Sequence, residues 1–319
     1  MDREELYAGR DILRRAVSRR RVRLMRQIAL CAVAVAGLAA SSCGATQRSA
    51  PSGSTTQTGA GAGPAGGSQS KPAASSTGTP GTQPVPILMY HVIAAPPAGA
   101  PFPGLYVPPA EFAEQMQALK GAGWHAVTLD QVAANWRTGA SLGGGKPIVL
   151  TFDNGYQSQF TQALPVLQRL GWVGTENIQL SGLPPSQGGL GEAQVRGLIA
   201  AGWELDTQGF SHADLITLSP ERLHYEVAVT RSVLQHKYRV PVNWFCYPSG
   251  HYDPAVIAEV RAAGYMGSTT VVPGWAHRSD DAYRLHRLRV LGGTSGPALL
   301  EQVASTRVAA AAPSAYSGG

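Results

Sequence analysis

The sequence has few cysteines, little charge and no long apolar run. Its 319 residues include three cysteines, and Cys31 and Cys43 both lie near the N-terminus, so Cys246 stands alone in the rest of the chain. A disulfide within the fold is therefore excluded, and burial of apolar side chains must hold the fold together. The apolar run Ile28–Ala40 is too short to span a bilayer comfortably, and its length is typical of an export signal.

A basic surface on the main part of the chain is also missing. The formal net charge is +6, but residues 1–26 alone carry nine arginines and four acidic residues. After Pro84 the chain has 15 basic and 16 acidic residues. This balance argues against an electrostatic nucleic-acid binder, so we expect no nucleic-acid partner.

Residues 1–43 are predicted to be a signal segment. The basic residues 19–26 precede the apolar run, which ends in "LAASSCG". This ending resembles a bacterial lipoprotein signal in which Cys43 is lipidated, and an ordinary cleaved signal near Ala45 is the alternative. Met25 is an alternative translation start. We expect an exported protein, which is either a lipoprotein on the extracytoplasmic face of the cell membrane or secreted.

The composition divides the remaining chain into three parts. Residues 44–84 consist of Gly, Ser, Thr, Ala, Pro and Gln with almost no large apolar side chain, and we expect a disordered linker there. Residues 85–307 carry the apolar patterning of one folded domain. Residues 308–319 are predicted to be a disordered tail.

A repeated signal within residues 85–307 predicts alternating helices and strands. Glycine followed by an aromatic residue closes four segments of helical periodicity, ending at Trp124, Trp172, Trp203 and Tyr265. Glycine suits the left-handed conformation that ends many helices, and the aromatic residue then opens an extended run. Helices are expected near 111–121, 158–170, 192–201, 220–238 and 254–263. Strands are expected near 85–89, 147–152, 173–178, 203–206, 244–246, 266–271 and 288–291.

The strand runs "VPILMY" and "PIVLTF" are apolar on both faces, as in parallel strands covered by helices. The predicted fold is a parallel α/β domain, whose site should lie at the carboxyl ends of the strands. Polar clusters follow the expected strand ends, and these clusters contain Asp153, Asn154, Tyr156, Gln208, His212, Tyr247, Ser249, His251 and His286.

Several ordered motifs resemble the polysaccharide deacetylase family, which is the NodB-homology domain or carbohydrate esterase family 4. The similar segments are "VPILMYHVI", "EFAEQMQALKGAGWHAVTLDQV", "TFDNGYQSQFTQALPVLQRLG", "GWELDTQGFSHADL" and "FCYPSGHYD". The resemblance covers residues 85–307, with the NodB-homology core at about 146–307. It implies a distorted (β/α) barrel that removes acetyl groups from a polysaccharide or cell-wall glycan.

The resemblance also implies roles for individual residues. Asp153 matches the family's general base. The three positions of the family's divalent metal ligands are occupied by Asn154, Gln208 and His212, so two of the three ligands are neutral amides. Such a set should hold zinc or a similar ion weakly or not at all. Glu176 or Asp206 could supply a missing carboxylate.

The family's acid histidine would fall on Arg287, one residue after His286. A shift of one residue would bring His286 into that role, and His286 is therefore the candidate acid. Tyr156, Tyr247, Ser249 and His251 are the candidate sugar-binding residues.

Three functions remain open at this point. The first is an extracytoplasmic deacetylase that uses Asp153 as its base. The second is a polysaccharide-binding protein that has lost turnover and stacks sugars on exposed aromatic residues such as Trp275. The third is metal-independent glycoside chemistry, which requires two carboxylates at a defined separation. The sequence does not indicate the glycan, the type of acetyl linkage or the oligomeric state.

Overall fold

A curled sheet of parallel strands forms the centre of the structure, a computed structural model that describes residues 79–183, 188–308 and 310–318. The strand order is β7-β6-β5-β4-β3-β1-β8, and β2 pairs with β3. The strands are β1 (Ile87–Tyr90), β2 (Trp124–Val127), β3 (Lys146–Asn154), β4 (Thr175–Ile178), β5 (Glu204–Thr207), β6 (Trp244–Cys246), β7 (Gly267–Thr269) and β8 (Leu288–Arg289).

The two ends of the sheet meet beside β7. Thr269 of β7 forms a parallel bridge with Leu285, which lies three residues before β8. The backbone N–H of Thr270 donates to the Leu285 carbonyl at 2.8 Å, and that of Arg287 donates to Val272 at 3.1 Å. The predicted distorted (β/α) barrel is therefore confirmed.

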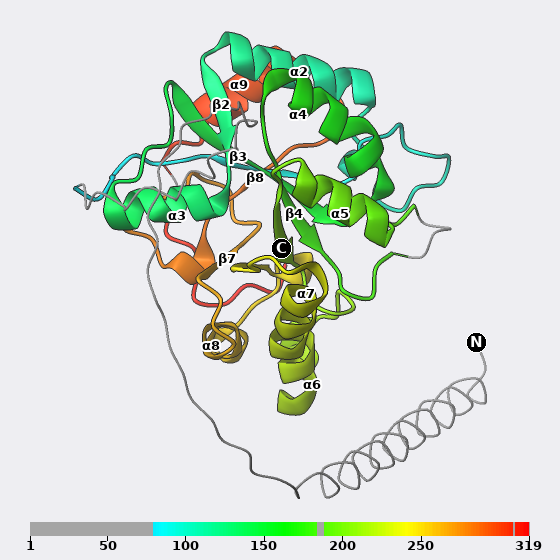
Figure 1. Ribbon diagram of the computed structural model, residues 1–319, viewed down its shortest axis with the longest axis vertical. Helices are drawn as coiled ribbons and strands as arrows, with labels where there is room; N and C mark the ends of the chain where they lie inside the picture. Colours follow the sequence, from blue (N-terminus) through cyan, green and yellow to red (C-terminus); the bar gives the residue numbers. More distant parts are fainter. Residues whose placement is uncertain (1–78, 184–187, 309, 319) are drawn as a thin grey trace, which may run out of the picture. The chain divides into compact units, whose positions relative to one another are not determined.

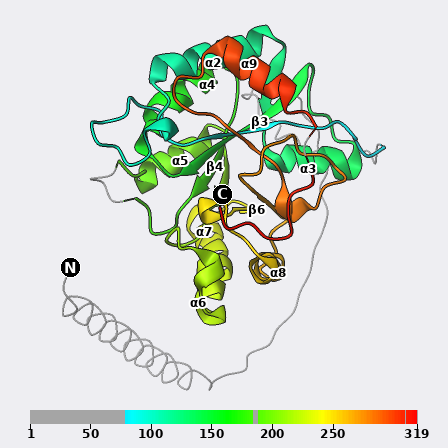
Figure 2. The ribbon, with the colours of Figure 1, turned by 180° about the vertical axis from the view of Figure 1, so that it is seen from behind.

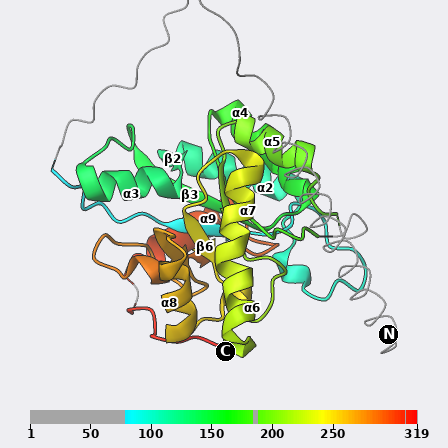
Figure 3. The same cartoon turned by 60° about the horizontal axis from the view of Figure 1, so that its bottom comes forward.

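Helices cover the outside of the sheet (Figure 1). Helices α2 and α9 lie side by side, with α4 and α5 nearby, and the view from behind shows the same grouping (Figure 2). Helices α6 and α7 continue one another through the π-helical turn η5 (Figure 3). The α-helices are α2 (Pro109–Gly121), α3 (Leu129–Thr138), α4 (Leu164–Leu170), α5 (Glu192–Ala200), α6 (Pro220–His224), α7 (Thr230–Tyr238), α8 (Pro254–Ala262) and α9 (Gly296–Ser305). The shorter turns are η1 (Pro103–Leu105), η2 (Gln159–Ala163), η4 (Leu215–Thr217), η5 (Tyr225–Val229), η6 (Pro248–Gly250) and η7 (Ala282–Arg284).

The glycines of the repeated signal adopt the expected backbone conformation. Gly123, Gly171, Gly202 and Gly264 have φ angles of 83°, 69°, 86° and 84°. Residues with a Cβ resist this left-handed region, so glycine ends each helix at low cost and turns the chain toward the sheet. Capping side chains begin two of the helices, because Ser219 accepts the Arg222 N–H and Asp253 accepts the Val256 N–H.

Aromatic packing fixes the outer face of β3. The ring of Phe152 lies 4.8 Å from Trp203 and 5.6 Å from Tyr90, measured between centroids, and all three side chains are buried. Side chains alternate between the two faces of a strand, so Asp153 points to the interior of the curled sheet. Packing on one face of β3 thus aims the polar side chain on the other.

The C-terminal segment differs from the expected disordered tail. Tyr316 forms an antiparallel bridge with Tyr252, and the Tyr252 hydroxyl donates to the Pro313 carbonyl at 2.9 Å. Figure 2 shows this segment, in red, passing α8 toward α7. This segment has no apolar periodicity, because its contacts are mostly hydrogen bonds to backbone carbonyls. Helices α3 and α9 and strand β2 were not among the expected elements either.

Within the described residues, no helix is long and apolar enough to cross a membrane. Residues 1–78, which hold the predicted signal segment (1–43) and most of the predicted linker (44–84), lie outside the described part of the chain. Residues 79–84, the end of that linker, are described, and the backbone N–H of Gly81 donates to the Asn135 carbonyl at 2.9 Å.

Candidate active site

A cavity of about 550 Å³ opens at the carboxyl ends of the strands. Asp153 and Asn154 reach it from the end of β3, Gln208 and His212 from the loop after β5, and Tyr247 from the loop after β6. Tyr156 and Ser249 also line it, so the structure brings together seven of the nine residues singled out in the sequence.

The other two residues lie outside this cavity. His251 is 3.1 Å from Asp214, measured from Nδ1 to Oδ1, and does not line the cavity. The Nε2 atom of His286 lies 2.9 Å from the carbonyl oxygen of Ala310, and its side chain is buried against the C-terminal segment. The one-residue register shift that would make His286 the acid does not occur, because Arg287 points inward instead.

Asp153 is held as a carboxylate at the floor of the cavity. Its Oδ1 accepts hydrogen bonds from Arg287 Nη1 and Asn177 Nδ2, both at 2.8 Å, and its Oδ2 lies 3.5 Å from the Cys246 sulfur. Burial by itself would raise the pKa of Asp153, but the charge of Arg287, that of His91 and these hydrogen bonds lower it to about 2. Asp153 is therefore ionised at any physiological pH.

All three guanidinium nitrogens of Arg287 donate hydrogen bonds to groups of the protein. Nε donates to the Thr270 carbonyl, Nη1 also donates to the Thr151 hydroxyl, and Nη2 donates to the Cys246 sulfur at 3.2 Å. Its side chain is 1% exposed. Burial raises the pKa of the Cys246 thiol to about 12, so Cys246 is a buried donor and acceptor and not a nucleophile.

The donor set at the family's metal positions does not fit zinc. The Gln208 carbonyl oxygen, Oε1, accepts the backbone N–H of Asn154 at 3.1 Å, which leaves its amide nitrogen as the free end. Asn154 is neutral, and His212 contributes a single imidazole, whose pKa burial lowers. Among the described residues, no cluster of three His, Cys, Asp or Glu side chains could hold a metal ion. One imidazole and two amides lack the anionic or thiolate ligands that zinc sites use.

Neither suspected substitute carboxylate reaches the cavity. Glu176 is in register with Phe152 and so lies on the opposite face of the sheet from Asp153. Both of its carboxyl oxygens lack a hydrogen-bond partner within the described residues, and burial raises its pKa. Asp206 accepts the backbone N–H groups of Asn243 and Trp244 at 2.9 and 2.8 Å. Among the described residues that line the cavity, Asp153 is the only carboxylate, so the carboxylate pair required for glycoside chemistry is not assembled.

Several cavity residues were not found from the sequence. His91 follows β1, and its Nδ1 atom has no hydrogen-bond partner among the described residues. Burial lowers the pKa of His91 to about 4, against the opposing charge of Asp153. Phe102 also lines the cavity, with 68% of its surface exposed, as do Gln179 and Arg289. The motif "MYH" was the available signal for His91, whereas Phe102 lies in a loop without periodicity.

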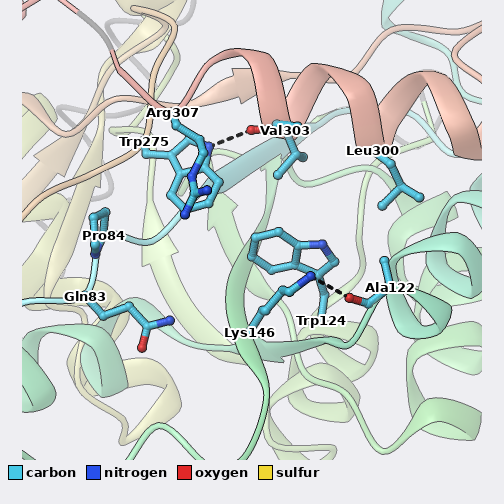
Figure 4. A pocket seen from close by; sticks show the side chains of 10 residues that line it. Gln83, Pro84, Ala122, Trp124, Lys146, Trp275, Leu300, Val303 and Arg307 are labelled. Carbon is cyan, nitrogen blue, oxygen red and sulfur yellow. Dashed lines mark hydrogen bonds between the residues drawn. The ribbon is translucent and has the colours of Figure 1, made fainter.

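A second cavity, of about 350 Å³, lies where strands β2 and β3 begin (Figure 4). Trp275 and Arg307 lie on one side of it, and Trp124 and Lys146 on the other. Trp275, which the sequence suggested as a sugar-stacking residue, therefore lies away from the cavity at Asp153. Sites in parallel α/β barrels form at the carboxyl ends of the strands, so the cavity at Asp153 is the candidate active site.

Glu226 fixes the loop that carries Gln208 and His212. It lies in the π-helical turn η5, is fully buried, and its Oε2 accepts the backbone N–H groups of Phe210 and Ser211 at 2.8 and 2.9 Å. Its Oε1 accepts the Ser211 hydroxyl at 2.7 Å and Arg222 Nη2 at 2.9 Å. Removing these charge-assisted bonds should free the loop.

Glu226→Gln should therefore lower the free energy of unfolding by about 2 kcal/mol, because an amide nitrogen would face donors that now meet a carboxylate oxygen. The amide protons of Phe210 and Ser211 should exchange faster with solvent in the same variant. Glu192→Gln is the matched control, since Glu192 pairs with Arg196 at an exposed position, and it should leave both measurements unchanged. Unchanged exchange in Glu226→Gln would show that other contacts hold the loop.

The fold and the site together define a parallel α/β barrel with a polar cavity at the carboxyl ends of its strands. Residues 142–268 match the family model described as polysaccharide deacetylase. The chain is 28% identical over 214 residues to the putative polysaccharide deacetylase YxkH of Bacillus subtilis, a match that covers 67% of this chain and 74% of that protein. Residues 142–268 therefore form a domain of the polysaccharide deacetylase type, and members of that family are hydrolases acting on the carbon–nitrogen bonds of acetylated polysaccharides.

Two further comparisons agree with this assignment. The deacetylase PplD of Streptococcus pyogenes, solved in complex with acetate, has a TM-score of 0.64 and 25% sequence identity, and the match covers 70% of this chain and 99% of that one. A stretch of 59 residues is 41% identical to the poly-beta-1,6-N-acetyl-D-glucosamine N-deacetylase of Escherichia coli, covering 18% of this chain and 9% of that protein.

Proposed function

We propose that this protein removes acetyl groups from a polysaccharide outside the cell membrane, with Asp153 as the general base. The observation that supports this most is the buried carboxylate of Asp153, held ionised by Arg287 at the floor of the cavity. Asp153 would take a proton from a water molecule, and the water oxygen would attack the acetyl carbon. The bond from that carbon to the sugar nitrogen or oxygen would then break, releasing acetate and a protonated leaving group.

The remaining cavity residues would bind and orient the sugar. His91 faces the same cavity as Asp153 and is neutral at pH 7, so its ring N–H can donate a hydrogen bond to the leaving group. The free amide nitrogen of Gln208 can donate to the acetyl oxygen as negative charge develops there. Tyr156 and the exposed ring of Phe102 would contact the sugar face.

The low pKa of Asp153 has a consequence for the rate. A carboxylate with a pKa of about 2 is ionised above about pH 3 but is a weak base. We therefore expect slow turnover, with substrate positioning supplying much of the acceleration. The pH profile should show no acid limb from Asp153 between pH 5 and pH 8.

Acetate release from a panel of N-acetylated and O-acetylated glycans tests this function. Asp153→Asn should reduce the rate at least 100-fold, because general-base catalysis typically contributes factors of 10² to 10⁴. Asp214→Asn, which changes a carboxylate outside the cavity, should retain the activity. Equal rates for wild type and Asp153→Asn would rule out Asp153 as the base.

A second candidate function is sugar binding without turnover. It is favoured by the two amides at the family's metal positions, Asn154 and Gln208, and by the commitment of the Gln208 oxygen to a backbone N–H. Glycan binding without acetate release from any member of the panel would select this second function.

We also propose that Cys43 anchors the exported protein through a lipid, as the sequence "LAASSCG" suggests. Cys43→Ser should prevent lipid attachment, so the protein should leave the membrane fraction or accumulate with its signal uncleaved. Labelling with a radioactive or alkyne-bearing fatty acid would check this directly, with Cys31→Ser as the control. Equal labelling of wild type and Cys43→Ser would contradict the anchor.

A further inference from the structure

The cavity at Asp153 carries one uncompensated positive charge. Its described lining residues include one carboxylate, Asp153, and two arginines, Arg287 and Arg289. The ion pair at 2.8 Å between Arg287 and Asp153 cancels two of these charges. The donors of Arg287 are also engaged with Thr270, Thr151 and Cys246. Arg289 therefore supplies the net charge that a ligand would meet.

Arg289 faces the cavity from strand β8. It lies two residues after Arg287, which places both side chains on one face of the strand. It is in register with Met89, another lining residue, and its charge contributes to the lowered pKa of His91. Arg289 is exposed, and its guanidinium has no hydrogen-bond or salt-bridge partner among the described residues. The group is thus open to a ligand.

Two neutral polar side chains of the cavity can donate to a ligand. Gln208 uses its oxygen within the protein and keeps its amide N–H groups free. The Ser249 hydroxyl also lines the cavity, whereas the Ser211 hydroxyl donates to Glu226. These donors and one free guanidinium complement a ligand that carries acceptors and a negative charge.

We propose that the cavity accepts an acidic polysaccharide, and that Arg289 binds a carboxylate on the sugar unit next to the one at Asp153. This proposal rests on the proposed polysaccharide-binding function of the cavity. A carboxylate carries one negative charge, which matches the single uncompensated charge, and its two oxygens match the planar fork of arginine. The substrate class is therefore a polymer that contains uronic acid units alongside acetylated sugars.

The affinity for unacetylated oligosaccharides, measured by calorimetry, tests this inference independently of turnover. The probes are a tetramer of galacturonate, its carboxyl-reduced neutral counterpart and a sulfated neutral tetramer. Wild type should bind the galacturonate about tenfold more tightly than the neutral tetramer, as expected for a charge-assisted Arg–carboxylate contact. Raising the salt concentration should reduce this preference.

Three variants separate the effect of Arg289 from general charge effects. Arg289→Gln should abolish the preference and leave binding of the neutral tetramer unchanged, and Arg289→Lys should keep part of it. Arg169→Gln removes an equal charge from an exposed position outside the cavity and should keep the full preference. Thermal unfolding of each variant should match that of wild type, since both arginines are exposed.

The outcomes distinguish this inference from the proposed function. A preference for galacturonate that depends on Arg289, without acetate release from any glycan, supports the inference and removes the deacetylase. Acetate release with no preference for acidic probes supports the deacetylase function and overturns the inference about Arg289. An equal loss in Arg169→Gln, or tighter binding of the sulfated tetramer, overturns the assignment of a carboxylate to Arg289.

Discussion

Unfolding of an Arg287→Met variant in urea at pH 7 is expected to require about 3–5 kcal/mol less free energy than unfolding of wild type. The reason is the carboxylate of Asp153, which is 1% exposed and would lose its positive partner while remaining buried. Arg287→Lys should also destabilise the protein, because an ammonium cannot reproduce donation to Thr270, Thr151, Asp153 and Cys246 together.

The double variant Arg287→Met/Asp153→Asn provides the control. Removing both charges leaves no uncompensated buried ion, so most of the lost stability should return. The coupling energy from the double-mutant cycle of Arg287→Met and Asp153→Asn measures the interaction of the pair. A double variant as unstable as Arg287→Met would show instead that lost packing of the long arginine side chain dominates.

The loss of stability in Arg287→Met should depend on pH in a defined direction. In wild type the pKa of Asp153 is lowered from 3.8 to about 2, so its contribution to stability is present above about pH 4 and is lost as the pH falls through 2. Without Arg287 the burial of Asp153 should raise its pKa. Protonation at acid pH would then remove the unpaired buried charge that destabilises the variant. The difference in the free energy of unfolding between wild type and Arg287→Met should therefore become smaller from pH 7 to pH 4.

Zinc titration of an Asn154→Asp/Gln208→His variant is expected to reveal affinity at least 100-fold higher than that of wild type. The double change supplies a carboxylate and a second imidazole beside His212, which is the ligand set that the family resemblance implies. The carboxylate contributes most, because it adds a full negative charge in a partly desolvated cavity. Each single variant should gain less, since the ligands act on one ion and their effects need not add.

Calorimetry with zinc, cobalt and nickel measures this effect. Gln179→His is the matched control, because it adds an imidazole to the wall of the same cavity at a position that is not a family ligand. Equal gains in Gln179→His would show that any added imidazole suffices. Tight metal binding by wild type would contradict the argument that the Gln208 oxygen is committed to the Asn154 N–H.

Local backbone preferences predicted most of the alternating helices and strands, although not α3, α9 and β2. The glycines at 123, 171, 202 and 264 have positive φ angles, and that conformation depends mainly on the absence of a Cβ atom in the residue itself. The capping side chains of Ser219 and Asp253 bond to N–H groups three residues away. Such short-range signals repeat along the chain, and together with the apolar strands they predict a parallel α/β domain whose polar side chains meet at one end. The family resemblance adds that the sheet is a distorted barrel.

The chemistry of the site depended on contacts that no local pattern encodes. Arg287 meets Asp153 across 134 residues of sequence, and Glu226 reaches back 15 and 16 residues to the loop at Ser211 and Phe210. The one-residue offset that points Arg287 inward and buries His286 against the C-terminal segment follows from how β8 pairs with β1. By itself the sequence determined the family, the barrel and the residues at the strand ends, because each rests on local geometry and motif order. Only the tertiary structure decided which charges neutralise each other and which one stays free, because electrostatic energy depends on distance in space and on burial.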